Sequence, residues 1–269
     1  MNNIQIKHII IVLLIAVTLQ GNAQIESPYK LNKFKDGAWV AGSLGMSAFG
    51  MYLFSEKEGL TERELANLDK NDRWEIDRWA AGNYSESANK ISDIPFFISF
   101  ATPFLFAINK DTRGLSGELG IMYLESLGTT AALFTLTAGL VDKGRPYVYS
   151  EEAPLKKRLS GSGLRSFYSG HVGASATATF FAAQVFSDLY PDSKAKSFVW
   201  AGAATIPAVV GYFRIKSGNH FLTDTLIGYV MGAASGILVP RIHRKKDSKL
   251  KFNAGIGFDQ TNIGLSYKF

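Results

Sequence analysis

The chain of 269 residues has no cysteine, which excludes disulfide bonds and thiolate chemistry and leaves the cellular compartment open on this criterion. It also has few charged residues, only 19% of the total, and no Pro/Ser-rich linker or run of like charge that would divide it. A chain of this length without such a boundary is expected to fold as one sizeable domain.

Apolar residues and glycine are plentiful instead. Hydrophobic residues make up 46% of the sequence and 26 residues are glycine, a composition that leans towards membrane association. The mean hydropathy is close to zero, so composition alone leaves this question open. The net charge of +6 suits phosphorylated or anionic-lipid partners. Because the Lys and Arg residues are dispersed and form no basic stripe interleaved with aromatics, no nucleic-acid partner is expected.

The first 23 residues have the pattern of a secretory signal peptide. Lys7 precedes an apolar run from Ile9 to Leu19, and small residues lead to a predicted cleavage site after Ala23. An uncleaved membrane anchor is the alternative, although the run is short for a span. Secretion would place the remaining chain in a bacterial cell envelope, in the membrane or the periplasm.

Six apolar segments follow, with lengths between those of a buried soluble helix and a bilayer span. They are Ala38–Phe54, Ile94–Ile108, Leu119–Val141, Val172–Tyr190, Phe198–Phe213 and Leu222–Pro240. They predict an all-α fold, an antiparallel bundle of about six core helices that is embedded in or associated with a membrane. The spacing of Gly228, Gly232 and Gly236 would allow close helix approach.

The C-terminal tail differs from the rest of the chain. Apolar residues alternate from Phe252 to Phe258 and again from Ile263 to Phe269, with the turn sequence Asp259-Gln260-Thr261-Asn262 between them. This pattern predicts a short β-hairpin. The expected organisation is therefore a signal peptide at 1–23, a helical domain at 24–246 and a hairpin tail at 247–269.

The most informative stretch runs from Arg214 to Asp224, between two apolar segments. Its Ser217-Gly218-Asn219 sequence predicts a turn followed by a helix start, so Arg214 and His220 can converge from two helices. His220 and Asp224 are spaced i, i+4 on one helix face. A carboxylate at that spacing can hold the imidazole in a chosen tautomer and make it a better nucleophile.

Two upstream motifs add phosphate-binding chemistry. Ser169-Gly170-His171 opens the fourth apolar segment, where free backbone N–H groups and the helix dipole favour an anion. Lys143-Gly144-Arg145-Pro146 lies at the end of the third segment. The long connection between these two motifs is typical of loops that form substrate pockets.

Together, Arg145-Pro146, Ser169-Gly170-His171 and Arg-x5-His-x3-Asp from Arg214 resemble the three motifs of the type 2 phosphatidic acid phosphatase family. This family includes bacterial acid phosphatases and vanadium haloperoxidases, and the resemblance spans roughly residues 70 to 240. The chain departs from the family pattern at three positions. Ala138 replaces the usual lysine of the first motif, Tyr168 replaces a proline, and Phe213 replaces a frequent serine.

The resemblance implies a metal-independent phosphatase without a cofactor. In that reading His220 attacks phosphorus to form a phosphohistidine, Asp224 orients it, and His171 protonates the leaving oxygen. The phosphate would be bound by five residues, namely Lys143, Arg145, Ser169, Gly170 and Arg214. Lys143 would partly replace the lysine absent at position 138. The substrate would be a phosphorylated lipid or another phosphomonoester or diphosphate.

Other interpretations of the same residues remain. His171 and His220 could be core histidines, or they could bind zinc with Asp224, although neighbouring arginines suit an anion better than a cation. A vanadate-dependent haloperoxidase would share the motifs. A non-catalytic membrane or lipid-binding homologue is suggested by Ala138 and the hairpin tail.

The order of the segments predicts that all three motifs lie at one end of the bundle. A basic cluster from Arg241 to Lys246 follows the last segment at the opposite end. The tendency of basic flanks to remain cytoplasmic would then place the active site in the periplasm. A cleaved signal peptide conflicts with this if all six helices span the membrane. The conflict disappears if the first helix lies in the interface, or if the bundle is soluble or peripheral.

Overall fold

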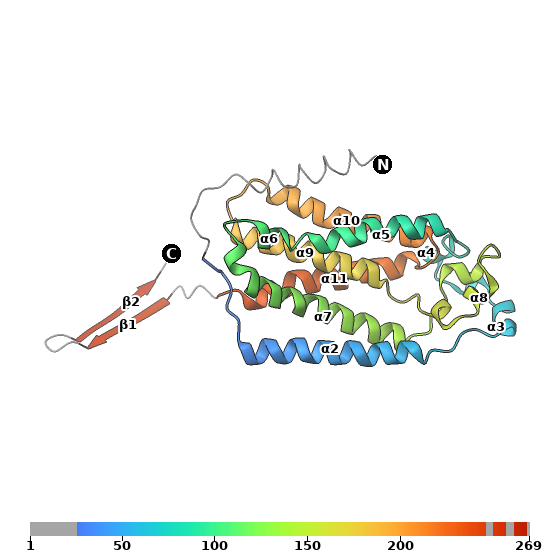
Figure 1. The fold of residues 1–269 in the computed structure, drawn as a ribbon, viewed down its shortest axis with the longest axis horizontal. Helices are drawn as coiled ribbons and strands as arrows, with labels where there is room; N and C mark the ends of the chain where they lie inside the picture. The colour runs from blue at the N-terminus through green and yellow to red at the C-terminus, as the bar shows by residue number, and fades with distance from the viewer. Residues whose placement is uncertain (1–25, 246–249, 257–260, 268–269) are drawn as a thin grey trace.

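Long antiparallel helices form a bundle in the computed structural model, which describes residues 26–245, 250–256 and 261–267 (Figure 1). The long helices are α2 (Lys33–Ser55), α5 (Glu86–Ala101), α7 (Ser116–Leu140), α9 (Gly170–Leu189), α10 (Lys196–Lys216) and α11 (Leu222–His243). Each overlaps one of the six apolar segments, which confirms the prediction of a mostly helical fold.

Shorter helices, including 3-10 helices labelled η, connect the long ones. They are α3 (Glu62–Ala66), η1 (Lys70–Asp72), α4 (Glu75–Arg78), α6 (Leu105–Ile108), η2 (Arg113–Leu115), η3 (Pro146–Tyr149), α8 (Leu155–Arg158) and η4 (Gly161–Leu164). Figure 1 shows α3, α4 and α8 together at one end of the bundle. The long connection between α7 and α9 contributes to this same end, as expected for a loop that carries two motifs.

Helix α9 is the centre of the bundle and packs against α5, α7, α10 and α11. Its contact with α11 is close because glycines of α11 face its backbone. A Cβ atom added to Gly232 would lie 2.0 Å from the carbonyl oxygen of Gly173, and one added to Gly228 would lie 2.4 Å from that of Ser169. The glycine spacing noted in the sequence is therefore required for this helix contact.

Helix α2 packs alongside α7 and is a full member of the bundle. Glycines again allow the approach, since a Cβ atom on Gly50 would lie 2.4 Å from Oγ1 of Thr135, and one on Gly128 would lie 2.4 Å from Oγ of Ser43. This contact does not support the alternative in which the first helix lies in the membrane interface away from the others.

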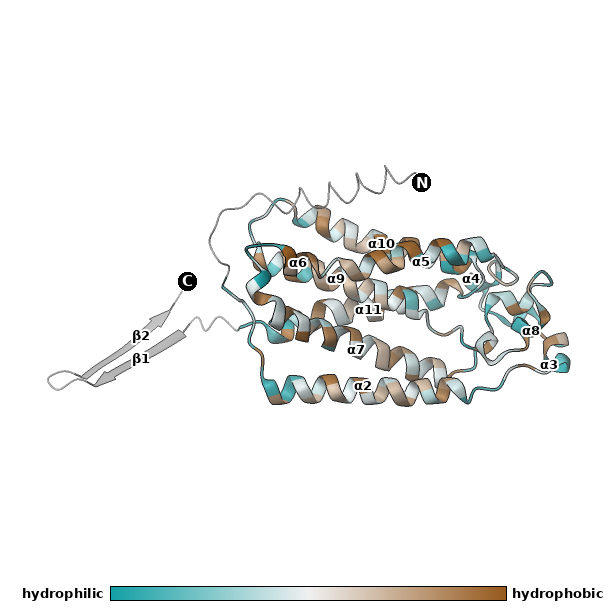
Figure 2. Ribbon diagram, in the orientation of Figure 1, coloured by the Kyte–Doolittle hydropathy of each residue, from teal (hydrophilic) through white to brown (hydrophobic). Residues whose placement is uncertain are grey.

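The outer surface of the bundle is apolar. Large hydrophobic side chains such as Phe49, Phe97, Phe198 and Val230 are exposed on four different helices, and apolar segments extend along the whole bundle (Figure 2). Three helices are long and apolar enough to cross a membrane, at 113–140, 196–216 and 222–243. An exposed apolar surface of this extent indicates a lipid environment, so the protein associates with a membrane.

Helix α5 differs from its sequence prediction. It begins at Glu86, where the Ser85 side chain accepts a hydrogen bond from the Ala88 amide at 3.2 Å. The helix therefore begins before the apolar segment that the sequence predicts from Ile94. The helix contains Pro95 and ends at Ala101, ahead of Pro103. Asp93 thus lies inside a helix that reaches the functional end of the bundle.

Two tryptophans flank α4 in the polar connection between α2 and α5. Trp74 and Trp79 are 71% and 60% exposed, respectively. Exposed tryptophan rings of this kind are typical of a membrane–water interface.

In the tail, strand β1 (Leu250–Ile256) pairs with β2 (Thr261–Tyr267) in antiparallel register, with Leu250 opposite Tyr267. The side chains of this pair lie outside the described residues, as does the predicted signal peptide at 1–23. The site is built from the helical domain.

Candidate active site

The third motif folds as a tight connection between two helices. Arg214 lies in the last turn of α10, and α11 begins at Leu222. Gly218 makes the turn with φ of 75°, and a Cβ atom there would lie 1.8 Å from the carbonyl oxygen of Asn83. Glycine is required at this position for both reasons. The turn brings His220 back toward Arg214, as the sequence predicts.

His220 is buried, and its ring is held by a backbone group. Its Nδ1 lies 2.7 Å from the carbonyl oxygen of Ser166. Because a carbonyl can only accept, Nδ1 carries the proton, and Nε2 keeps the lone pair that a nucleophile needs. Burial, Arg145 and Arg214 hold the pKa of His220 well below its usual value. The ring is therefore neutral at physiological pH.

Asp224 does not contact His220 directly, contrary to the sequence-based expectation. Its Oδ2 accepts hydrogen bonds from the Ser166 hydroxyl at 2.6 Å and the Phe221 amide at 2.9 Å. Its Oδ1 accepts from Nζ of Lys143 at 2.8 Å. The carboxylate acts on His220 through Ser166, whose hydroxyl binds Asp224 while its carbonyl binds the imidazole. The Asp224 side chain instead caps the N-terminus of α11 by accepting from the Phe221 amide.

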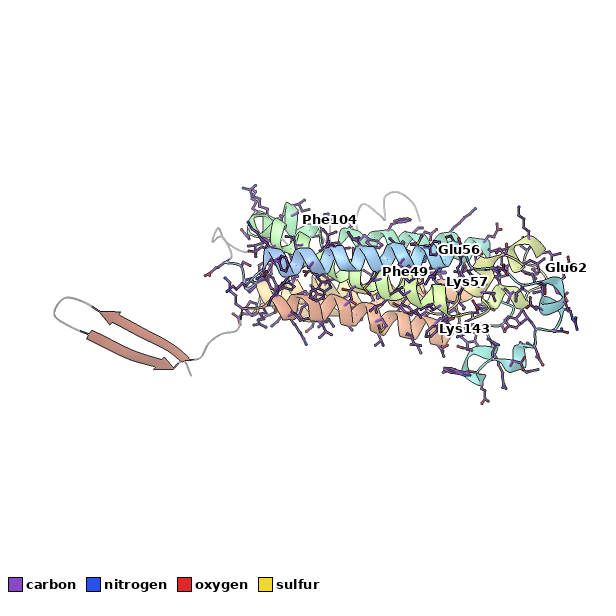
Figure 3. All side chains as sticks on the ribbon, turned by 90° about the horizontal axis from the view of Figure 1, so that it is seen from below. Phe49, Glu56, Lys57, Glu62, Phe104 and Lys143 are labelled. Atoms are coloured by element: carbon purple, nitrogen blue, oxygen red, sulfur yellow. The ribbon has the colours of Figure 1, made fainter. Side chains whose placement is uncertain are left out.

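Lys143 is also placed differently from its predicted role as a phosphate ligand. Besides Asp224, its Nζ contacts Oγ1 of Thr223 at 3.2 Å and Oδ2 of Asp77 at 3.4 Å. Two carboxylates thus compensate its charge within the protein. Figure 3 shows Lys143 at the same end of the bundle as Lys57 and Glu62, away from Phe104. This geometry favours a role in positioning Asp224.

The absent lysine of the first motif leaves no polar gap. Ala138 is fully buried inside α7, and its carbonyl oxygen accepts a hydrogen bond from Nζ of Lys57 at 2.8 Å. Lys57 also binds the carbonyl of Val141 at 2.8 Å and pairs with Asp142 at 2.9 Å. It therefore caps the C-terminus of α7, where a cation is favourable, and does not replace a phosphate ligand.

Two arginines form the anion-binding part of the site. Nη1 of Arg214 donates to Oδ1 of Asn89 at 2.7 Å, and Nη1 of Arg145 donates to Oδ1 of Asn219 at 2.8 Å. Nδ2 of Asn219 donates to the same Asn89 oxygen at 3.0 Å, which links the two guanidinium groups through amides. Within residues 26–245 neither arginine forms a salt bridge with a carboxylate. Their charges are available to an anion.

His171 lies in the first turn of α9, beside the arginines. Its ring stacks on Phe96 with centroids 4.5 Å apart, and its Nε2 lies 4.0 Å from Oδ1 of Asp93. The side chain is 37% exposed, so substrate can reach it. Burial, Arg214 and Arg145 lower the pKa of His171 to about 3. The carboxylate near His171 comes from another helix, since Asp93 belongs to α5.

Ser169 and Gly170 connect the second motif to the third. The Ser169 amide donates to the carbonyl oxygen of Asp224 at 3.0 Å. This amide is therefore not free for phosphate. The Ser169 hydroxyl is buried and has no hydrogen-bond partner among the described residues. Gly170 must lack a side chain, because a Cβ atom would lie 2.7 Å from the ring of Phe134.

Several site residues were not singled out by sequence reasoning. Asp77, Asn89, Asp93 and Ser166 lie outside the three motifs. Each reaches the site through a tertiary contact between elements distant in sequence, which no local pattern predicts. Asn219 was noted only as a turn residue, although it is the amide between the two arginines.

The site agrees with the comparison to known families. The family model of the PAP2 superfamily matches residues 119–248, a range that contains all three motifs. This match confirms the resemblance seen in the motifs. No curated relative matches the chain.

Two solved structures are similar to this chain. One is a transmembrane PAP2-type phosphatidylglycerolphosphate phosphatase from Bacillus subtilis, with 23% sequence identity, 74% of this chain and 94% of that chain covered, and a TM-score of 0.45. The other is LpxE from Aquifex aeolicus, with 20% identity, coverage of 61% and 92%, respectively, and a TM-score of 0.40.

Proposed function

We propose that the protein is a metal-independent phosphatase that hydrolyses a phosphomonoester or a terminal diphosphate, most suitably of a lipid, through a phosphohistidine. The observation that carries this proposal is the pair of arginines without carboxylate partners beside two neutral histidines. Arg145 and Arg214 both act electrostatically on His171 and His220. Such a site attracts an anion and provides a nucleophile next to it.

The first step is attack by Nε2 of His220 on phosphorus. The Ser166 carbonyl holds the proton on Nδ1, so the attacking nitrogen has its lone pair directed away from the backbone. A bond forms between Nε2 and phosphorus while the bond from phosphorus to the leaving oxygen breaks. Arg145 and Arg214 neutralise charge on the equatorial oxygens, and this positioning is the main requirement of phosphoryl transfer.

His171 then transfers protons. It donates one to the leaving oxygen and takes one from the water that hydrolyses the phosphohistidine, which releases phosphate and restores both histidines. The pKa of His171 is about 3 in the free protein, so His171 can act as an acid only after the substrate has bound. A phosphate dianion bound by the arginines offsets two of the causes that lower this pKa. Binding should therefore raise the pKa of His171 and charge the acid only when substrate is present.

A lipid substrate is supported by the surroundings of the site. Exposed apolar side chains cover the bundle, and a cavity of about 510 Å³ opens on α10, lined by Ala204, Thr205, Ala208, Val209, Tyr212 and Phe213. Phe213, one of the residues that line this cavity, directly precedes Arg214 in the sequence. An acyl or isoprenoid chain along this face would leave its phosphate at the end of the bundle where the two arginines lie.

We place the catalytic end on the periplasmic side of a bacterial membrane. The basic residues that follow α11 support this orientation because they lie at the opposite end of the bundle. The predicted signal peptide at 1–23 supports an envelope location, but because α2 belongs to the bundle, a span through α2 would reverse the orientation. Measuring which side of the membrane the catalytic end faces decides between the two orientations.

The test is a phosphate-release assay on the purified protein with excess EDTA. Phosphatidate, phosphatidylglycerophosphate, an undecaprenyl diphosphate and a lipid A phosphate would be compared with p-nitrophenyl phosphate. We expect turnover of at least one lipid phosphate, with none in the His220→Ala variant.

Activity lost with EDTA and restored by zinc or magnesium would contradict the mechanism. Bromide oxidation with added vanadate, without phosphatase activity, would identify a haloperoxidase instead. A folded protein inactive in both assays would be a binding homologue.

A further inference from the structure

Three ionisable side chains meet at the end of the bundle opposite the active site. Asp36 comes from α2, Glu125 from α7 and His243 from α11, and all three are buried. Helix α11 has 22 residues and carries Asp224 in its first turn, so at 1.5 Å per residue the two sites are separated by about 30 Å. The proposed phosphatase mechanism uses none of these three residues.

The tautomer of His243 is determined by its own helix. Its Nδ1 lies 2.9 Å from the carbonyl oxygen of Val239 and must donate its proton there. Its Nε2 then faces Oδ1 of Asp36 at 3.4 Å and Oε2 of Glu125 at 3.3 Å. In a neutral imidazole this nitrogen carries a lone pair. Three electron-rich atoms would then face one another, and a cation must lie among them.

A proton on Nε2 satisfies this cluster incompletely. One N–H can donate to one carboxylate, and among the described residues only the Asp36 contact, at 3.4 Å, has hydrogen-bond geometry. Both oxygens of Glu125 are buried and accept no hydrogen bond from any described residue. Two carboxylates and one imidazolium also leave a net negative charge in a buried place, which is unfavourable. A divalent cation with a neutral imidazole gives a net charge of zero and a ligand bond to each side chain.

The distances suit a transition-metal ion. One donor atom from each residue lies within 4.8 Å of the other two, and the two distances from Nε2 are 3.3 and 3.4 Å. Ligands about 2.1 Å from a tetrahedral ion are separated by about 3.4 Å. Outer contacts resemble those of metal sites, because the Val239 carbonyl orients His243 and the Asn32 amide donates to Oδ2 of Asp36 at 2.6 Å.

We infer that Asp36, Glu125 and His243 bind one divalent transition-metal ion, with Zn²⁺ as the best-suited probe, through two carboxylate oxygens and Nε2. The ion would join α2, α7 and α11 at the end of the bundle remote from catalysis. Asp188, a buried carboxylate at the same end, is excluded from this set because it pairs with Arg244 at 3.2 Å and accepts from Tyr29 at 3.0 Å.

The experiment measures Zn²⁺ binding to the full chain in detergent after treatment with a chelator. We expect one ion per chain in the wild type, and a loss of affinity of at least about 100-fold in Glu125→Gln, since loss of an outer partner alone costs 10- to 100-fold. Asp188→Asn is the matched control and should bind as the wild type does. His220→Ala should also bind normally, which separates this site from the phosphatase.

A measurement on the wild type alone guards against a variant that fails to fold. Co²⁺ added to the chelator-treated protein should give the intense visible absorption of a four-coordinate ion, and Zn²⁺ should displace it. Binding would also raise the Tm, whereas phosphatase turnover below the Tm would be the same with and without the ion. No uptake by folded wild type, or equal uptake by Glu125→Gln, would overturn the proposal and leave a proton-bridged ion cluster.

Discussion

At the scale of single residues, the two active-site histidines differ in the groups that hold them. The Ser166 carbonyl binds His220 at 2.7 Å, whereas His171 is stacked on Phe96 and lies 4.0 Å from Asp93. One ring is therefore fixed in the tautomer of a nucleophile. The other is partly exposed and can exchange protons with a leaving group and with water.

Replacing each of the two histidines by alanine should consequently change the activity in a different way. His220→Ala should abolish activity toward every substrate because no phosphohistidine can form. His171→Ala should retain turnover of p-nitrophenyl phosphate, whose leaving oxygen needs little protonation. Rapid quenching with labelled substrate should trap acid-labile, base-stable label on His171→Ala. Label on His220→Ala would show that another residue is the nucleophile.

Lys143 gives a second prediction at this scale. Lys143→Met leaves the buried Asp224 carboxylate without its cation, and breaking such a pair costs about 3–5 kcal/mol. Both the Tm and kcat/KM should therefore fall. Lys156→Met, a change in an exposed lysine of α8 in the same connection, is the control and should alter neither. A fall in kcat/KM with an unchanged Tm would restore Lys143 to direct phosphate binding.

At the scale of elements, the contact between α9 and α11 depends on the absence of side chains. The Cβ atom of Gly232→Ala would lie 2.0 Å from the Gly173 carbonyl oxygen, and backbone cannot yield as a flexible side chain can. Overpacking of this kind costs about 1–3 kcal/mol. The variant should have a lower Tm and lower activity, because both helices begin in the site.

Gly202→Ala is the matched control for this contact. Gly202 lies inside α10, and nothing is within 4 Å of a Cβ atom added there. Replacing a helical glycine by alanine where space is free stabilises a helix by about 0.5–1 kcal/mol. Its Tm should be unchanged or slightly higher. Equal losses of stability in both variants would mean that the close contact does not limit packing.

The sequence predicted these helices well and their internal contacts poorly, for a physical reason. Apolar runs and glycine spacing are local properties, so the six long helices and the convergence of the motifs at one end were recognisable. Hydrogen bonds that cross from one element to another are not local. The link from Asp224 through Ser166 to His220 and the approach of Asp93 to His171 could be found only from the fold. The same holds for the start of α5 at Glu86.

At the scale of the whole molecule, the orientation in the membrane can be measured cleanly because the chain contains no cysteine. A single cysteine at exposed Glu152 reports on the catalytic end, and one at exposed Lys110 reports on the opposite end. With an impermeant maleimide on intact spheroplasts, we expect labelling of Glu152→Cys only. Labelling of both after lysis is the control. The reverse pattern would place the catalytic end in the cytoplasm.

The amide link between the two arginines has a consequence for how the enzyme would be regulated by its own product. Arg145 and Arg214 are held in place through Asn219 and Asn89 before any ligand arrives, so little ordering is needed when an anion binds. Inorganic phosphate carries the same charged oxygens as the transferred group. It should compete for the site and slow turnover wherever phosphate accumulates. The rate of lipid dephosphorylation should therefore fall as the phosphate concentration of the surrounding medium rises.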